Sequence, residues 1–116
     1  MNQKTVLVVD DDADIRESLR DAFEDAGYLV RCAANGREGL EALQRFDRPS
    51  VVVLDLIMPI MTGNELYDAM QADPQFADVP VILSTSDASR APSGVPLLQK
   101  PINLQRMLTT IESFCH

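Results

Sequence analysis

Histidine, cysteine and long apolar runs are scarce in this sequence, and each shortage argues against a class of protein. The one histidine, His116, ends the chain, so it is a poor candidate for a general base or a phosphorylated side chain. Cys32 and Cys115 lie far apart without metal-ligand spacing, which favours incidental thiols in a reducing compartment. The first residues hold no apolar signal core, and no apolar run approaches membrane-spanning length. We therefore expect a cytoplasmic protein that does not bind a membrane.

Basic residues are also in the minority. Ten lysines and arginines face 18 aspartates and glutamates, which gives a formal net charge of −8 and argues against direct binding to nucleic acid. The 116 residues, 46% of them hydrophobic, suit one compact domain that covers residues 1–116. The initial Met1 leads us to expect a natural N-terminus, whereas the last residues do not indicate whether a further domain follows.

Short apolar runs alternate with amphipathic segments along the chain. The runs are typical of buried parallel strands, and they cover residues 6–9, 28–32, 50–54, 81–84 and 97–99. Segments with helical spacing cover residues 15–26, 40–46, 62–73 and 103–111, with Asp12, Thr62 and Asn103 as suitable N-caps. This alternation predicts an α/β fold of the flavodoxin-like type, a doubly wound five-stranded parallel sheet in the order 2-1-3-4-5.

One expected helix is missing from this alternation. The segment from Ser86 to Pro96 contains two prolines and a glycine and has no apolar helical stripe. A helix needs such a stripe to pack against a sheet. We therefore predict that the fourth helix is shortened or replaced by a loop.

Three carboxylates follow strands that this sheet order makes neighbours. Asp10 and Asp11 end the first strand, and Asp55 ends the third. Ligands bind beyond the carboxyl ends of the strands in such sheets, and neighbouring strands lie about 4.8 Å apart, so these side chains would crowd one pocket. A hard divalent cation, Mg²⁺ or Mn²⁺, would relieve their mutual repulsion.

A hydroxyl and an ammonium group are expected at the same edge. Thr85 follows the fourth strand, and Lys100 follows the fifth. Carboxylates, a metal ion, a hydroxyl donor and an ammonium around one point fit phosphoryl transfer, in which catalysis is mostly positioning and charge neutralisation. Asp55 would be the nucleophile, because carboxylates can form aspartyl-phosphate intermediates.

In these residues the chain resembles the receiver domain of bacterial two-component response regulators. The matching pieces are Val8–Asp11, Asp55–Gly63, Thr85 with Ser86, and Lys100 with Pro101, in order over essentially the whole chain. The resemblance implies that Asp55 accepts a phosphoryl group from a histidine kinase or phosphotransfer protein in a Mg-dependent reaction. It implies as metal ligands Asp11, Asp55, the backbone carbonyl of Ile57 and, through water, Asp10. Thr85 and Lys100 would each bind a phosphoryl oxygen, and the bond between Lys100 and Pro101 would be cis.

The resemblance implies a signalling phosphoacceptor rather than an enzyme, one that catalyses only its own phosphorylation and dephosphorylation. It would switch the binding of a downstream protein or relay the phosphate. Without the fourth helix, we expect a monomer, or a weak dimer that does not use the family's usual face of helix four, strand five and helix five. Leu97 stands where the family often has a switch aromatic, so residues 86–96 become the candidate moving element. Ile57 and Asp87 would flank the path of an attacking water, and the apolar Ile57 predicts a longer-lived phosphoryl group.

Two other classes of function remain as alternatives. The first is a receiver-like interaction module that is never phosphorylated; the missing helix and Leu97 favour it, and the intact acidic set argues against it. The second is a flavin-binding or hydrolytic enzyme on the same sheet. The acidic segment after the first strand lacks the Ser/Thr/Gly-rich loop that a flavin phosphate needs, and no second acid or base is present to turn over a free substrate.

Overall fold

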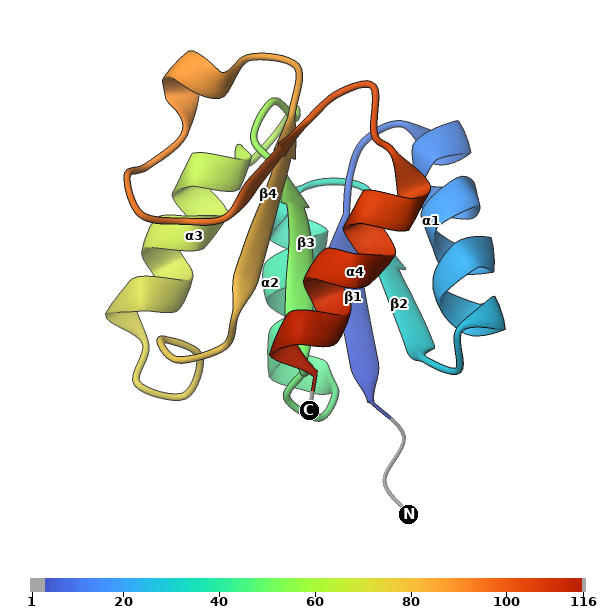
Figure 1. The fold of residues 1–116 in the computed structure, drawn as a ribbon. Helices are drawn as coiled ribbons and strands as arrows, with labels where there is room; N and C mark the ends of the chain where they lie inside the picture. Colours follow the sequence, from blue (N-terminus) through green and yellow to red (C-terminus); the bar gives the residue numbers. More distant parts are fainter. Residues whose placement is uncertain (1–3, 116) are drawn as a thin grey trace.

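The computed structural model describes residues 4–115, so the expectations for Met1 and His116 lie outside it. One parallel sheet has the order β2-β1-β3-β4-β5, as the sequence predicts. The strands are β1 Thr5–Val9, β2 Leu29–Ala33, β3 Val51–Asp55, β4 Val81–Thr85 and β5 Leu97–Gln99. The helices are α1 Ala13–Asp25, α2 Gly36–Arg45, α3 Gly63–Ala72 and α4 Leu104–Phe114 (Figure 1).

The helices cover the sheet from both sides (Figure 1). Successive residues of a strand point to opposite faces, so β1 contributes alternately to two cores. Val6 and Val8 pack with residues of α1 and α4, and Leu7 and Val9 pack with residues of α2 and α3. This double burial explains why the strands read as continuous apolar runs instead of alternating patterns.

The predicted N-caps are confirmed. The Asp12 carboxylate accepts backbone N–H bonds at the start of α1, Thr62 forms a capping box with Glu65, and Asn103 caps α4. Asn35 is a further N-cap: its side chain accepts the Glu38 N–H at the start of α2. Such side chains satisfy N–H groups that have no partner within the helix.

The fourth helix of the pattern is absent, which confirms the prediction for residues 86–96. Only a single turn of 3₁₀ helix, η1 Ala88–Arg90, stands between β4 and β5. One detail of the helical pattern was wrong. Phe46, the last residue of the predicted helical segment 40–46, lies just beyond α2, where its ring packs under the guanidinium of Arg31.

The strand register brings the carboxyl ends of β1, β3 and β4 to one edge of the sheet. Val9 pairs with Leu54 and Asp55 pairs with Ser84, so the residues that follow β1 lie next to the end of β3. This edge is uppermost in Figure 1. No helix within residues 4–115 has the length and apolar character needed to cross a bilayer.

Candidate functional site

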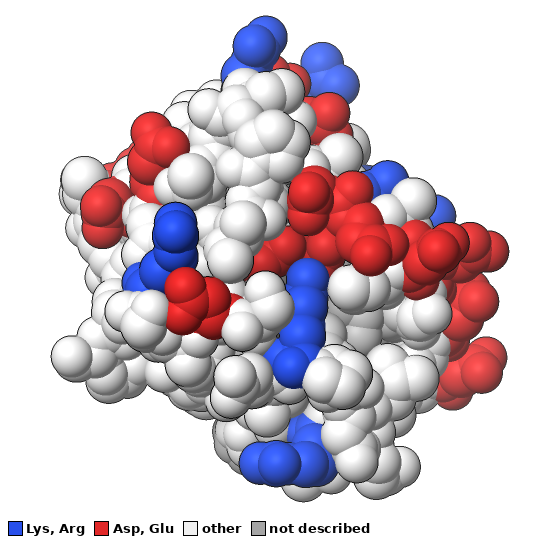
Figure 2. All heavy atoms as spheres, turned by 90° about the horizontal axis from the view of Figure 1, so that it is seen from above, with Lys and Arg blue, Asp and Glu red and all other residues white. Residues whose placement is uncertain are grey.

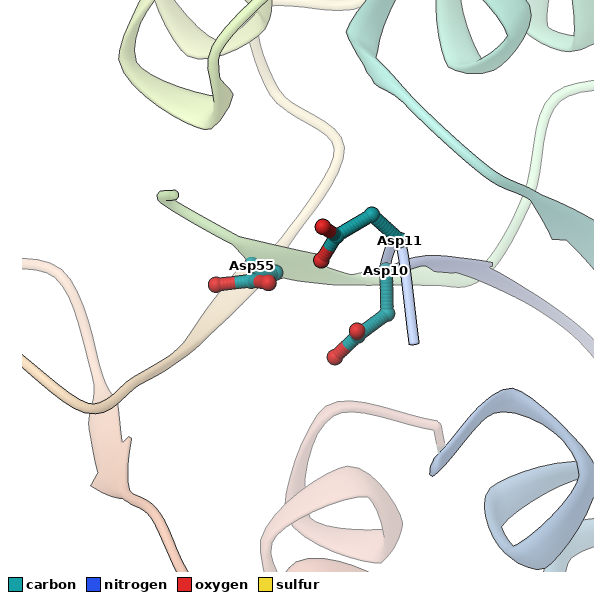
Figure 3. A group of neighbouring side chains, drawn as sticks. All are labelled: Asp10, Asp11 and Asp55. Carbon is teal, nitrogen blue, oxygen red and sulfur yellow. The ribbon is translucent and has the colours of Figure 1, made fainter. Parts of the chain in front are cut away.

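The three predicted carboxylates meet at this edge of the sheet. Asp10 and Asp11 follow β1, Asp55 is the last residue of β3, and one oxygen from each lies within 4.8 Å of the others. In Figure 3, the side chains of Asp10 and Asp11 both extend toward the side on which Asp55 lies. Asp10 and Asp55 are only 2% and 3% exposed, whereas Asp11 is exposed. Two buried acids and one accessible acid therefore share a single pocket.

Lys100 provides the positive charge of this pocket. Its Nζ lies 3.0 Å from Asp10 Oδ2 and 3.3 Å from Asp55 Oδ2. The lysine backbone N–H donates to the Thr85 carbonyl at 2.8 Å, and the expected cis bond joins Lys100 to Pro101. Burial would lower the pKa of Lys100, but hydrogen bonding and attraction to Asp10 and then Asp55 outweigh it and raise that pKa. Figure 2 shows acidic side chains grouped on this face with a basic side chain beside them.

The backbone after β3 fixes the Asp55 carboxylate. Oδ1 accepts the Ile57 N–H at 3.1 Å. Gly63 begins α3 against the same turn, and its N–H donates to the Leu56 carbonyl. A Cβ on Gly63 would overlap the Asp55 carbonyl oxygen, so only glycine permits this close approach. Gly63 therefore serves the backbone geometry of this turn.

The environment of Asp55 disfavours its charge. Burial raises the pKa of Asp55 from 3.8 to about 6; the hydrogen bond from Ile57 opposes this, the charge of Asp10 adds to it, and Lys100 opposes it. Removing a carboxylate from water and placing it beside a second acid both favour the neutral form. One lysine therefore compensates the crowded carboxylates only in part.

Asp10 is held at its backbone as well as at its side chain. Its N–H donates to the Ala33 carbonyl, and its Oδ1 accepts the Asp12 N–H at 2.9 Å. Its carbonyl oxygen accepts a hydrogen bond from Arg16 Nη1 at 2.7 Å. Arg16 was not among the residues predicted for the site. The available signal was a basic residue on the first turn of the helix that follows the acidic strand end.

Thr85 is fully buried at the end of β4, and its hydroxyl is tied to the next turn. Thr85 Oγ1 accepts the Asp87 N–H at 3.1 Å and donates a long bond of 3.5 Å to the Asp87 carbonyl. The Asp87 carboxylate accepts from the Ser89 N–H, the Ser89 hydroxyl and Arg90 Nε. Asn64 of α3 then donates from Nδ2 to the Arg90 carbonyl at 2.9 Å. A chain of hydrogen bonds thus joins Thr85 to η1 and to α3.

Two exposed apolar side chains lie in the segment between Asp55 and α3. Ile57, two residues after Asp55, is 42% exposed, and Ile60 is 73% exposed. Ile60 has a φ of 70°, an uncommon conformation for a β-branched residue. Asp87, expected beside the path of water, has its carboxylate engaged in the η1 turn.

The donor set suits a hard divalent cation. Asp10, Asp11 and Asp55 offer only oxygen atoms within the reach of one ion, which is the chemistry that Mg²⁺ and Mn²⁺ prefer. The accessible Asp11 opens the pocket to solvent, and Mg²⁺ usually retains several waters. The residues therefore fit such an ion.

Comparison with known proteins identifies the family of this fold and site. The family model described as "Response regulator receiver domain" matches residues 6–112. Response regulator MprA of Mycolicibacterium vanbaalenii is 34% identical over 93% of the chain, which spans 48% of that protein. Protein Rrf1 of Nitratidesulfovibrio vulgaris is 34% identical over 92% of the chain and 79% of its own length.

Solved structures agree with this match. The chemotaxis response regulator CheY4 of Vibrio cholerae superposes with a TM-score of 0.87 at 33% identity, covering 97% of this chain and 99% of that one. The chain spans about half the length of MprA, so the comparison concerns one domain of that relative. The chain belongs to the response regulator receiver domain family.

Proposed function

We propose that this chain is a phosphate-accepting receiver. Asp55 takes a phosphoryl group from the phosphohistidine of a histidine kinase or phosphotransfer protein. The bond from histidine nitrogen to phosphorus breaks as the bond from the Asp55 carboxylate oxygen to phosphorus forms, and the histidine retains the electron pair. The observation that carries this proposal is the meeting of three carboxylates from two strands with a lysine that follows a third strand.

Each residue of the site has a distinct part in the proposal. Asp55 supplies the nucleophilic oxygen, and the hydrogen bond from the Ile57 N–H aims its carboxylate. Asp11, Asp55 and the Ile57 carbonyl would hold Mg²⁺ or Mn²⁺ directly, with Asp10 acting through water. A divalent ion there supplies positive charge to the phosphoryl oxygens. Lys100 leaves its ion pair with Asp55 and moves to a phosphoryl oxygen, because phosphorylation removes the charge of the free carboxylate.

Thr85 links this chemistry to the rest of the molecule. Its hydroxyl is now occupied by the backbone of Asp87. If the hydroxyl donates to a phosphoryl oxygen instead, it can no longer donate to the Asp87 carbonyl, and movement of Thr85 toward the phosphoryl group lengthens its bond from the Asp87 N–H. The η1 segment then loses its support at Thr85 and is released. The segment 86–96 is then the switch that changes partner binding, in place of a helix and an aromatic. In this proposal the chain catalyses only its own phosphorylation and dephosphorylation.

Treatment with acetyl phosphate tests the proposal. With MgCl₂ present, we expect intact-mass spectrometry to show the addition of one phosphoryl group to the wild type and none to Asp55→Ala. Asp68→Ala removes an exposed carboxylate of α3 and should behave like the wild type. Equal labelling of Asp55→Ala and wild type would refute the assignment of Asp55.

A second candidate function is an interaction module that is never phosphorylated. The replacement of a helix by η1 and the presence of Leu97 favour it, since both remove parts of the usual output face. The same assay separates the two functions. Wild-type protein that stays unlabelled at saturating acetyl phosphate and MgCl₂ would favour the interaction module.

A further inference from the structure

Arg16 contacts the acidic site in an unexpected way. It lies on the first full turn of α1, and its Nη1 donates to the carbonyl oxygen of Asp10 at 2.7 Å. The ion pairs that the structure shows for the buried carboxylates come instead from Lys100. The guanidinium therefore binds the backbone of the site, and the lysine binds its side chains.

The carbonyl of Asp10 affects the orientation of two of the three carboxylates. It belongs to the planar peptide unit that joins Asp10 to Asp11. The direction of this carbonyl therefore also fixes the orientation of the peptide plane that contains the Asp11 nitrogen and Cα. β1 ends at Val9, and the Asp10 N–H still pairs with Ala33 of β2. Beyond that bond the backbone leaves the sheet, and Arg16 holds the next carbonyl. One side chain thus orders the peptide between two of the three carboxylates.

Arg16 could affect Mg²⁺ binding in two opposite ways, through its charge and through its hydrogen bond to the backbone. A guanidinium near the pocket repels a divalent cation, so its removal should tighten metal binding if charge dominates. Arg16 is partly exposed, and salt and water screen such repulsion. A short hydrogen bond from a charged donor is among the stronger ones in proteins, and it acts on the geometry of the site.

We propose that Arg16 is a positioning residue that holds the Asp10–Asp11 peptide so that both carboxylates face Asp55. This inference rests on the proposed function in one respect, namely that the pocket takes Mg²⁺. Residues that orient metal ligands commonly change metal affinity by about 10- to 100-fold when they are replaced. For this partly exposed contact, we expect a change near the lower end of that range.

The test is titration of MgCl₂ into the metal-free protein, followed by calorimetry or amide NMR shifts. Arg16→Met keeps the apolar stem and removes both donor and charge, so we expect Mg²⁺ to bind about tenfold more weakly. Arg16→Lys keeps the charge and a donor and should restore part of the affinity. Arg20→Met is the matched control, because it removes the same charge one turn further along α1. We expect its Mg²⁺ affinity to stay within about twofold of wild type or to rise.

A metal-free measurement makes the test independent of Mg²⁺. The Asp12 N–H donates to Asp10 Oδ1, so its hydrogen exchange reports the order of this turn. Exchange should be about tenfold faster in Arg16→Met than in Arg20→Met, with urea denaturation used to correct for any change in global stability. Tighter Mg²⁺ binding by Arg16→Met, or equal effects of the two methionine variants, would overturn the positioning role.

Failure of the proposed function has a different signature. If wild type does not respond to MgCl₂, the proposed metal site is wrong, and the role of Arg16 toward Mg²⁺ falls with it. If wild type binds Mg²⁺ and accepts phosphate while Arg16→Met does both equally well, the proposed function stands and this inference fails.

Discussion

Replacing Asp55 with asparagine should stabilise the metal-free protein at neutral pH. Asp55 has its pKa raised from 3.8 to about 6, chiefly because it is buried. An acid with a raised pKa binds its proton more tightly in the folded than in the unfolded state. The free energy of unfolding therefore falls as pH rises from about 4 to about 6 and then stays low. An asparagine at this position has no charge to bury, so Asp55→Asn avoids this loss.

The size of the effect follows from the same pKa. A tenfold change in proton affinity corresponds to about 1.4 kcal/mol, so moving the pKa from 3.8 to about 6 destabilises the fold by about 3 kcal/mol above pH 6. The side chain is 3% exposed, so solvent screening reduces this figure little. Asparagine loses part of the contact with Lys100. We therefore expect the free energy of unfolding of Asp55→Asn to exceed that of wild type by about 2 kcal/mol at pH 7.5.

Urea denaturation followed by circular dichroism measures this difference. Wild type and Asp55→Asn are compared at pH 4, 5, 6 and 7.5 in the presence of EDTA, and the gap should widen as pH rises. Asp68→Asn controls for the removal of one exposed charge from an acidic protein. Saturating MgCl₂ should narrow the gap at pH 7.5, because a cation bound only by the folded wild type adds stability. A gap that is constant with pH, or a less stable Asp55→Asn at pH 7.5, would refute the reasoning.

Three further substitutions test other parts of the site. Ile57→Asn places a hydrogen-bonding group beside Asp55 and should speed the loss of the phosphoryl group about fivefold, measured by the decay of the phosphorylated mass; unchanged or slower loss would contradict this. Gly63→Ala should cost about 3 kcal/mol in urea denaturation, because its Cβ meets the Asp55 carbonyl. Asn64→Ala should speed amide exchange in η1 without phosphate present, whereas Gln44→Ala, an exposed amide of α2, should not.

The fold could be predicted because its local and global signals agree. The three central strands, β1, β3 and β4, are largely apolar runs buried on both faces, and Asp12, Thr62 and Asn103 cap helices at the places where their side chains favour a helix start. The absence of a fourth helix could also be predicted from the sequence, since prolines and a glycine interrupt residues 86–96. The prediction placed Phe46 in the helix because helical spacing does not reveal a contact with another element. The guanidinium of Arg31 in β2 lies over the Phe46 ring in a cation–π contact.

The site was predicted only in part, for a physical reason. Asp10, Asp11, Asp55 and Lys100 are fixed by strand ends, so the order of the sheet alone brings them together. The contacts of Arg16 and Asn64 depend on long or rotatable side chains that reach backbone carbonyls. Backbone acceptors occur at every residue, so neither the type of these side chains nor their spacing indicates which carbonyl each one reaches.

Lys100 sets the charge balance of the acidic site in the metal-free protein. By bridging Asp10 and Asp55, it supplies an internal counter-ion, so the acids remain gathered when magnesium is scarce. In the proposed function, an incoming Mg²⁺ would therefore find its carboxylate ligands already assembled. The metal-free site would need little rearrangement to take the ion, and Lys100 would stay beside it until the phosphoryl group arrives.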